Sequence, residues 1–136
     1  MIPAALNDAN SLREGVHFDS MGDFKKLRVW VEAQQFAVLS SKAIKQLPDY
    51  ERFILADQWR RAAYSVPLNI AEGTGRKGQR EFCRYLGIAW GSLHELEAIL
   101  ELIGALEYIP ADELATLKTK RADCARMIYG LIRRFR

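Results

Sequence analysis

Apolar residues recur at steps of three and four along most of this chain, the spacing at which side chains share one face of an α-helix. The cleanest repeat lies between residues 79 and 106, where the apolar positions are Phe82, Leu86, Ala89, Leu93, Leu96, Leu100 and Ile103. No stretch shows the strict apolar–polar alternation of a half-buried strand. The pattern predicts an all-α protein.

The repeat and its interruptions predict four helices. They run from about Asp23 to Gln46, from about Tyr50 to Glu72, from about Gln79 to Leu106, and from near Pro110 to the C-terminus. Leu47-Pro48-Asp49 ends the first helix, and Asp49 is the expected N-cap of the second. Because short connections make sequential helices run antiparallel, the four apolar stripes predict an up-down-up-down four-helix bundle.

The stripes also name a candidate core on the other three helices. Pro67 lies inside the second helix, where a missing backbone donor predicts a kink near Ala63. Asn69 is the expected partner of the carbonyl that Pro67 frees, and Ser65 is expected to bond to a carbonyl of its own helix. Arg121 interrupts the fourth stripe. The expected core members are Leu27, Trp30, Ala33, Ala37 and Ile44, then Leu55, Trp59, Ala62, Val66 and Asn69, then Leu114, Leu117, Cys124, Ile128, Leu131 and Phe135.

Residues 1–21 show no sustained periodicity, so we expect an irregular or mobile arm before a bundle domain at 22–136. A chain of 136 residues fits one domain. No apolar run reaches the roughly 20 residues of a membrane span, and the first residues lack the basic start of a signal peptide. Cys83 and Cys124 stand outside any CxxC pattern, which favours a reduced compartment. We expect a cytoplasmic protein.

The net charge is only +3, but the cations are unevenly spread. Residues 118–136 hold seven Lys or Arg against one acid, Asp123. Cations suit the C-terminal end of a helix dipole, and a tail that faces a polyanion is the alternative interpretation. Four more cations gather where the third helix begins, and with its free amides they form a candidate phosphate seat. They are Arg76, Lys77, Arg80 and Arg84. Internal pairing with Glu72 and Glu81 is the competing interpretation.

Glycines in two places call for different explanations. Gly73, Gly75 and Gly78 have the spacing G-x-G-x-x-G, but a helix and not a strand precedes them, which excludes a dinucleotide site and favours a helix cap and a flexible link. Gly87 and Gly91 lie inside the third helix, where each costs about 1 kcal/mol relative to Ala. With the adjacent Trp90, they predict close approach of another helix, either from the same bundle or from a second subunit.

No catalytic or metal site emerges from the sequence, and no cofactor is expected. A di-iron bundle needs two Glu-x-x-His pairs, whereas His17 lies in the arm and His94 has Gly91 three residues before it. His94 with Glu97 is half a site at best, and a surface histidine is the simpler interpretation. Ser65 lacks the strand–turn–helix elbow of a serine nucleophile.

A longer pattern surrounds these residues. It consists of the segments RRAA at 60–63, SVP at 65–67, NIAEG at 69–73, GR at 75–76, EF at 81–82, RYL at 84–86, IA at 88–89, GSL at 91–93 and ELE at 95–97. The pattern resembles the bacterial four helix bundle protein family, also called the 23S rRNA intervening-sequence proteins. Leu27, Trp30 and Ala33 fit its first helix, and the resemblance covers about residues 24–132. Gly78 departs from the serine that members often carry.

The resemblance implies a cytosolic bundle that assembles into ring-like homopentamers, with no established enzymatic activity. The family is also similar to accessory proteins of diversity-generating retroelements, whose basic surfaces engage nucleic acid and a reverse transcriptase. We therefore expect a non-enzymatic homo-oligomer that binds RNA or a ribonucleoprotein; the alternative is a protein-interaction scaffold without a nucleic-acid role. The candidate contacts are Arg76, Lys77, Arg80 and Arg84 in one patch and Arg126, Arg133, Arg134 and Arg136 in another.

Overall fold

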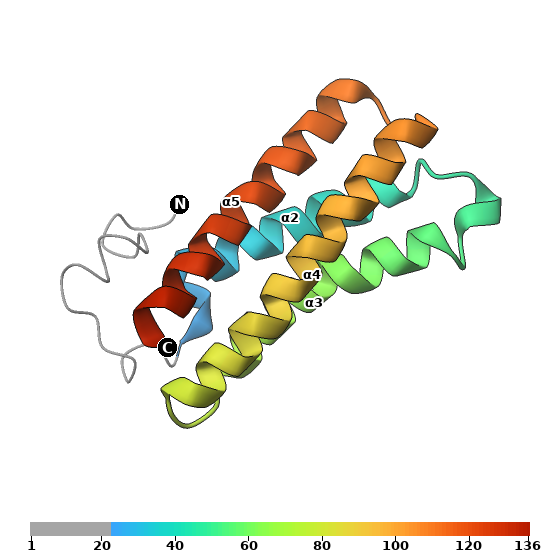
Figure 1. Cartoon of the computed structure of the whole chain (residues 1–136). Helices are drawn as coiled ribbons and strands as arrows, with labels where there is room; N and C mark the ends of the chain where they lie inside the picture. The colour runs from blue at the N-terminus through green and yellow to red at the C-terminus, as the bar shows by residue number, and fades with distance from the viewer. Residues whose placement is uncertain (1–22) are drawn as a thin grey trace.

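The protein is described by a computed structural model, in which residues 23–136 are placed (Figure 1). Within that range the chain is helical and contains no strand, which confirms the all-α prediction. The expected arm at 1–21 and residue 22, where the bundle domain was expected to begin, lie outside the described residues. The elements are η3 (Phe24–Lys26), α2 (Arg28–Ile44), η4 (Asp49–Glu51), α3 (Leu55–Thr74), α4 (Gln79–Leu106) and α5 (Ala111–Phe135).

The four long helices lie side by side, and successive helices run in alternating directions (Figure 1). Each helix packs against its neighbours along the chain, α5 also packs against α2, and α2 and α4 therefore lie diagonally across the core. Two hydrogen bonds fix the register of α3 against α4: Gln58 donates to Glu95 over 2.9 Å, and the hydroxyl oxygens of Ser65 and Ser92 lie 2.8 Å apart.

The core consists of the inward faces of all four helices. All seven apolar positions predicted for α4 are buried, and so are five of the six predicted for α5, with Leu114 half-buried. Four of the five positions predicted for the first helix are buried, namely Leu27, Ala33, Ala37 and Ile44, whereas Trp30 is half-buried. Val29 and Phe36, which were not predicted, are fully buried. Trp30 and its chain neighbours Val29 and Val31 are all apolar, so the sequence pattern did not determine which of these side chains faces the core.

The start of α3 differs from the prediction, because the chain first forms a short 3-10 turn. The amide of Glu51 bonds to the carbonyl of Pro48 at 2.9 Å and the amide of Arg52 to that of Asp49 at 3.0 Å, which is the i→i+3 pattern of a 3-10 helix. As a result α3 begins only at Leu55, and Asp49 does not act as its N-cap. The carboxylate of Asp49 is exposed and lies at the end of the bundle.

Pro67 lies buried in the middle of α3, and the helix continues beyond it to Thr74, as expected. The kink itself stays a prediction. Asn69 donates its side-chain amide to the carbonyl of Ser65 at 2.8 Å and to the Ser65 hydroxyl at 2.9 Å. It does not bond to the carbonyl of Ala63 that Pro67 frees, so that expectation was wrong. The Ser65 hydroxyl bonds to Ser92 of α4 instead of a carbonyl of its own helix.

Arg121 explains how a cation can occupy the apolar stripe of α5. Its side chain is only 12% exposed, and its guanidinium donates to the carbonyl of Leu93 at 3.2 Å. The same group lies 3.5 Å from the carboxylate of Glu97. The long aliphatic stem covers apolar surface while the charged head reaches polar partners on α4.

Candidate nucleic-acid interface

The two basic stretches of the sequence meet at one end of the bundle. The rings of Phe82, near the start of α4, and Phe135, at the end of α5, pack edge to face with centroids 5.8 Å apart. The loop between α3 and α4 therefore lies beside the end of α5, and η3 lies at the same end (Figure 1). About fifty residues separate these segments in sequence, so the fold alone brings them together.

We define the cationic end as segments 23–28, 72–84 and 133–136. It holds ten Lys or Arg and three acids, Asp23, Glu72 and Glu81, an excess of seven positive charges where the whole chain has +3. The opposite acidic end, segments 45–57 and 101–113, holds seven acids against Lys45 and Arg52, an excess of five negative charges. The bundle thus carries charges of opposite sign at its two ends.

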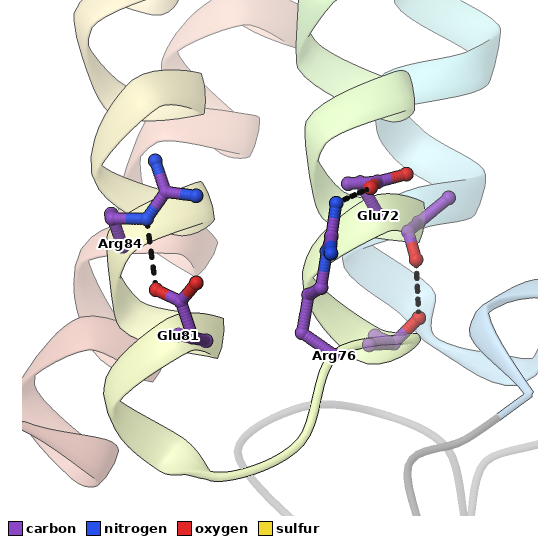
Figure 2. Close-up of polar contacts among 6 residues, drawn as sticks. Glu72, Arg76, Glu81 and Arg84 are labelled. Carbon is purple, nitrogen blue, oxygen red and sulfur yellow. Dashed lines mark hydrogen bonds and ion pairs between the residues drawn. The ribbon is translucent and has the colours of Figure 1, made fainter.

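Three of the eight predicted contact residues pair with acids three or four residues away in the sequence. Arg76 bonds to Glu72 at 2.5 Å and Arg84 to Glu81 at 2.8 Å (Figure 2). The hydrogen bond from Arg84 lowers the pKa of Glu81, and those carboxylates raise the pKa of Arg76 and of Arg84. Arg126 pairs with Asp123 in the same way. Internal pairing, the competing interpretation, therefore holds for these three.

The other five contact residues form no ion pair with any residue between 23 and 136. They are Lys77, Arg80, Arg133, Arg134 and Arg136. All five are exposed to solvent. Arg133 rests its guanidinium over the ring of Tyr129, 5.7 Å from the centroid. Their charge is available to an external anion without breaking an internal pair.

The loop that carries Lys77 is held by close packing between α3 and α4. A Cβ added at Gly73 would lie 2.9 Å from the Cβ of Tyr85 and 3.2 Å from the ring of Phe82, so only glycine fits there. Gly78 has φ +88, which also favours glycine. The ring of Tyr85 has the guanidinium of Arg76 at 5.5 Å and that of Arg84 at 4.5 Å. Cations and ring are positioned by the helix hairpin itself.

The N-terminus of α4 opens into the cationic end without a side-chain cap. Gly78 occupies the N-cap position, and no described side chain accepts a hydrogen bond from the amides of residues 79–81. Unsatisfied amides at a helix N-terminus carry partial positive charge and attract anions. The glycine-rich loop follows a helix, α3, and residues 23–136 contain no strand. Because a dinucleotide site needs a strand before this loop, that interpretation stays excluded.

Gly87 and Gly91 do not pack against a helix of the same bundle. A Cβ added at either would meet nothing within 4 Å, and both are exposed. Of the two alternatives that the sequence left open, a helix of the same bundle is therefore excluded, and a second subunit stays a prediction. Trp90 between them is half-buried, with His94 at 4.7 Å and Tyr129 at 5.6 Å between ring centroids.

His94 is exposed, as expected of a surface histidine. Among residues 23–136, no three His, Cys, Asp or Glu side chains come close enough together to hold a metal ion. Both cysteines are unbridged, with Cys83 half-buried and Cys124 buried. None of the helices in this part of the chain is long and apolar enough to cross a membrane.

Comparison with known proteins agrees with this architecture. Residues 25–130 match the model of the 23S rRNA-intervening sequence protein family. The chain belongs to this family. A crystal structure of a protein with unknown function from the S23 ribosomal protein family of Bacteroides thetaiotaomicron is similar to this 23S rRNA-intervening sequence protein, with a TM-score of 0.72 and 24% identity. The match covers 77% of this chain and 95% of the other, and it shows a shared fold. No curated protein matches the chain.

Proposed function

We propose that this member of the 23S rRNA-intervening sequence protein family is a non-enzymatic, cytoplasmic homo-oligomer that binds RNA or a ribonucleoprotein through its cationic end. The observation that carries the proposal is the meeting of two distant basic stretches at one end of the bundle, where eight of the ten cations form no ion pair with a residue between 23 and 136. A local excess of seven positive charges attracts a phosphate backbone and releases its counterions. Such contacts give affinity without reading base sequence.

A salt titration tests this function. Filter binding to a 30-nucleotide RNA should weaken steeply with salt, and Arg80→Gln or Arg134→Gln should each reduce the log–log slope by about 1. Lys45→Gln, which removes a cation from the acidic end, is the matched control and should leave the slope unchanged. A flat salt response of the unaltered protein would rule the function out.

Self-association is the second part of the proposal, and two different apolar surfaces support it. On α4, the exposed Gly87 and Gly91 leave the helix surface bare, with the exposed Ile88 beside them. Between α2 and α5, away from α4, lies an open hollow of about 300 Å³ lined by Gln34, Gln35, Val38, Leu39 and Lys120. Closed rings need two unlike faces on each subunit. In this proposal α4 of one copy packs against the hollow of the next.

Light scattering tests the assembly. Gly91→Leu adds bulk where a neighbouring copy would approach, so we expect its measured mass to fall toward that of one chain. Thr119→Leu, on the outer face of α5, is the control and should keep the mass of the unaltered protein. An unaltered protein that already has the mass of a single chain would contradict the assembly.

A scaffold that binds only protein is the alternative function, favoured by the internal ion pairs of Arg76, Arg84 and Arg126. In a pull-down with the tagged protein, nuclease treatment separates the two functions. A partner held through RNA is lost after digestion, whereas a partner of a scaffold stays bound.

A further inference from the structure

The acidic end of the bundle exposes large apolar side chains on its surface. Phe53 is 82% exposed, Tyr50 71% and Ile54 67%, all in the segment that joins α2 to α3. Leu102 and Leu106, in the last turns of α4, are also exposed at this end. Single exposed apolar residues are ordinary, but a group of five at one end of a small domain is typical of an interaction surface. We call these five residues the apolar tip.

The apolar tip is held in place by hydrogen bonds and is not a loose loop. The amide of Ile54 bonds to the carbonyl of Glu51 at 3.0 Å, and the carbonyl of Ile54 accepts from the amide of Gln58 at 3.0 Å. Tyr108, between α4 and α5, donates its hydroxyl to Glu51 at 2.8 Å and lies 3.1 Å from the hydroxyl of Tyr50. These bonds join the segment to the α4–α5 connection. Phe53 and Ile54 therefore point outward from an ordered backbone.

The charge around the apolar tip limits what can bind there. Segments 45–57 and 101–113 hold seven acids against two cations. Two of these acids are already paired, Asp57 with Arg60 and Arg61 and Glu101 with Lys118. Asp49, Glu107 and Asp112 form no ion pair with a residue of the described range. Phosphates of nucleic acid and anionic lipid headgroups would be repelled by this excess. The occupant must bring positive charge together with apolar side chains.

A second copy of the chain does not meet this requirement through its cationic end. None of the exposed large apolar side chains of residues 23–136 falls in segments 23–28, 72–84 or 133–136. End-to-end stacking would match charge with charge but would leave Phe53 and Ile54 against a polar surface. An occupant that brings both positive charge and apolar side chains is therefore expected to be a different protein.

We infer that the apolar tip docks a basic amphipathic segment of a partner protein. Phe53 and Ile54 would insert among the apolar residues of that segment, and its Lys or Arg side chains would lie near Asp49, Glu107 and Asp112. Anchors of this kind contribute most of the binding energy, while the surrounding charges select the partner and speed its association. The inference goes beyond RNA binding, because the two sites lie at opposite ends and use different residues.

Fluorescence anisotropy with a synthetic probe tests it. The probe is a labelled 20-residue peptide in which Leu and Lys alternate at helical spacing, compared with the same pattern in Leu and Glu. We expect the Leu/Lys peptide to bind and the Leu/Glu peptide to bind at least ten-fold more weakly. A double variant, Phe53→Ser with Ile54→Ser, should weaken binding of the Leu/Lys peptide at least ten-fold, and Glu107→Lys with Asp112→Lys about as much.

Leu68→Ser is the matched control, because Leu68 is as exposed as Ile54 but lies in the middle of α3. It should leave peptide binding unchanged. No binding of the Leu/Lys peptide, equal binding of both peptides, or binding that survives the double variant would each overturn the inference. A loss of oligomer mass in the double variant would overturn it too, since the tip would then be a contact between copies. RNA binding by that variant should stay intact, so the RNA function and the apolar tip stand or fall separately.

Discussion

Individual glycines have opposite roles in this bundle, depending on what faces them. Gly73 sits where the backbones of α3 and α4 approach each other, and the side chain of Tyr85 would collide with any added Cβ. Gly87 faces open space within the single chain. The first is needed for the fold itself, whereas the second weakens an isolated helix and gains a role only when another molecule covers it.

Alanine at these two positions should therefore change stability in opposite directions. Gly73→Ala is expected to lower the free energy of unfolding by about 1–3 kcal/mol, because overpacking a rigid contact forces the helices apart. Gly87→Ala is expected to raise it by about 0.5–1 kcal/mol, because alanine favours the helix. Urea unfolding at concentrations where the chain is monomeric measures both. A destabilising effect of Gly87→Ala under these conditions would show a neighbour that the single chain lacks.

The two cysteines should differ in reactivity. Burial raises the pKa of Cys124 to about 12 and also raises the pKa of the half-buried Cys83. At pH 8 we expect iodoacetamide to modify Cys83 slowly and to leave Cys124 unmodified until urea unfolds the protein, as mass spectrometry would show. The buried thiol stabilises the fold below its unfolded pKa of about 8.5, and this contribution decreases as the pH rises toward 12. Rapid modification of native Cys124 would contradict its burial.

Among the elements, α5 combines an apolar stripe with a largely buried cation, Arg121, and α4 supplies the partners of this cation. The carbonyl of Leu93 and the carboxylate of Glu97 both serve Arg121, while Lys118 pairs with Glu101 at 3.1 Å one turn away. Two of the seven cations in residues 118–136 are thus balanced by acids of α4, and Arg126 by Asp123 of α5. Of the cations without an ion pair in this helix and its end, Arg133, Arg134 and Arg136 lie at the C-terminus, and Lys120 lies in the middle of the helix.

Replacing Arg121 separates packing from pairing. Arg121→Met keeps most of the volume and removes a desolvated charge, so we expect a change in unfolding free energy within about 1 kcal/mol of zero. Arg121→Ala leaves a cavity in the seam and should cost about 2 kcal/mol or more. Lys118→Met, at a more exposed ion pair, is the control and should change stability by less than about 0.5 kcal/mol. Equal effects of Met and Ala at residue 121 would mean that the ion pair, and not the packing, stabilises α5.

The sequence predicted the helices well where one face alone is apolar. In α4 all seven positions of the repeat from Phe82 to Ile103 are buried, and the repeat missed only Ile99. In α2, Trp30 lies next to Val29 and both are apolar, so the direction of the core depended on the other helices. The late start of α3 depended on i→i+3 bonds after Pro48 that compete with a longer helix. Periodicity locates an element, but its neighbours decide which face is buried and where it begins.

For the candidate site, the sequence identified the cations but not their arrangement. Arg80 and Arg134 come from helices that run in opposite directions, and only the bundle shows that their ends coincide. The sequence also could not show which cations their own helices neutralise, although the spacing of Glu81 and Arg84 predicted that pair correctly. For Gly87 and Gly91 the sequence could not decide between a helix of the same bundle and a second subunit, because it shows the small residues but not what faces them; the structure excludes the first.

For the whole molecule, the separation of charge predicts an end-on complex with RNA. Lys25, Lys26 and Lys77 belong to the cationic end, whereas Lys45 belongs to the acidic end. Acetylation with an amine-reactive reagent, read by mass spectrometry, should be reduced several-fold by RNA at the first three and unchanged at Lys45. Protection of Lys45 as well would indicate that RNA covers the bundle lengthwise, contrary to the proposal.

The 28 residues of α4 extend from one end of the bundle to the other, about 42 Å at 1.5 Å per residue. A helix of that length is rigid, so a molecule bound at Phe53 would lie about 42 Å from an RNA bound at the cationic end. In a closed ring of subunits, the α4 helices would lie side by side with the same orientation. One face of the ring would then present the guanidinium groups of the cationic ends to a polyanion. The opposite face would hold the bound partner protein at a fixed distance from that polyanion.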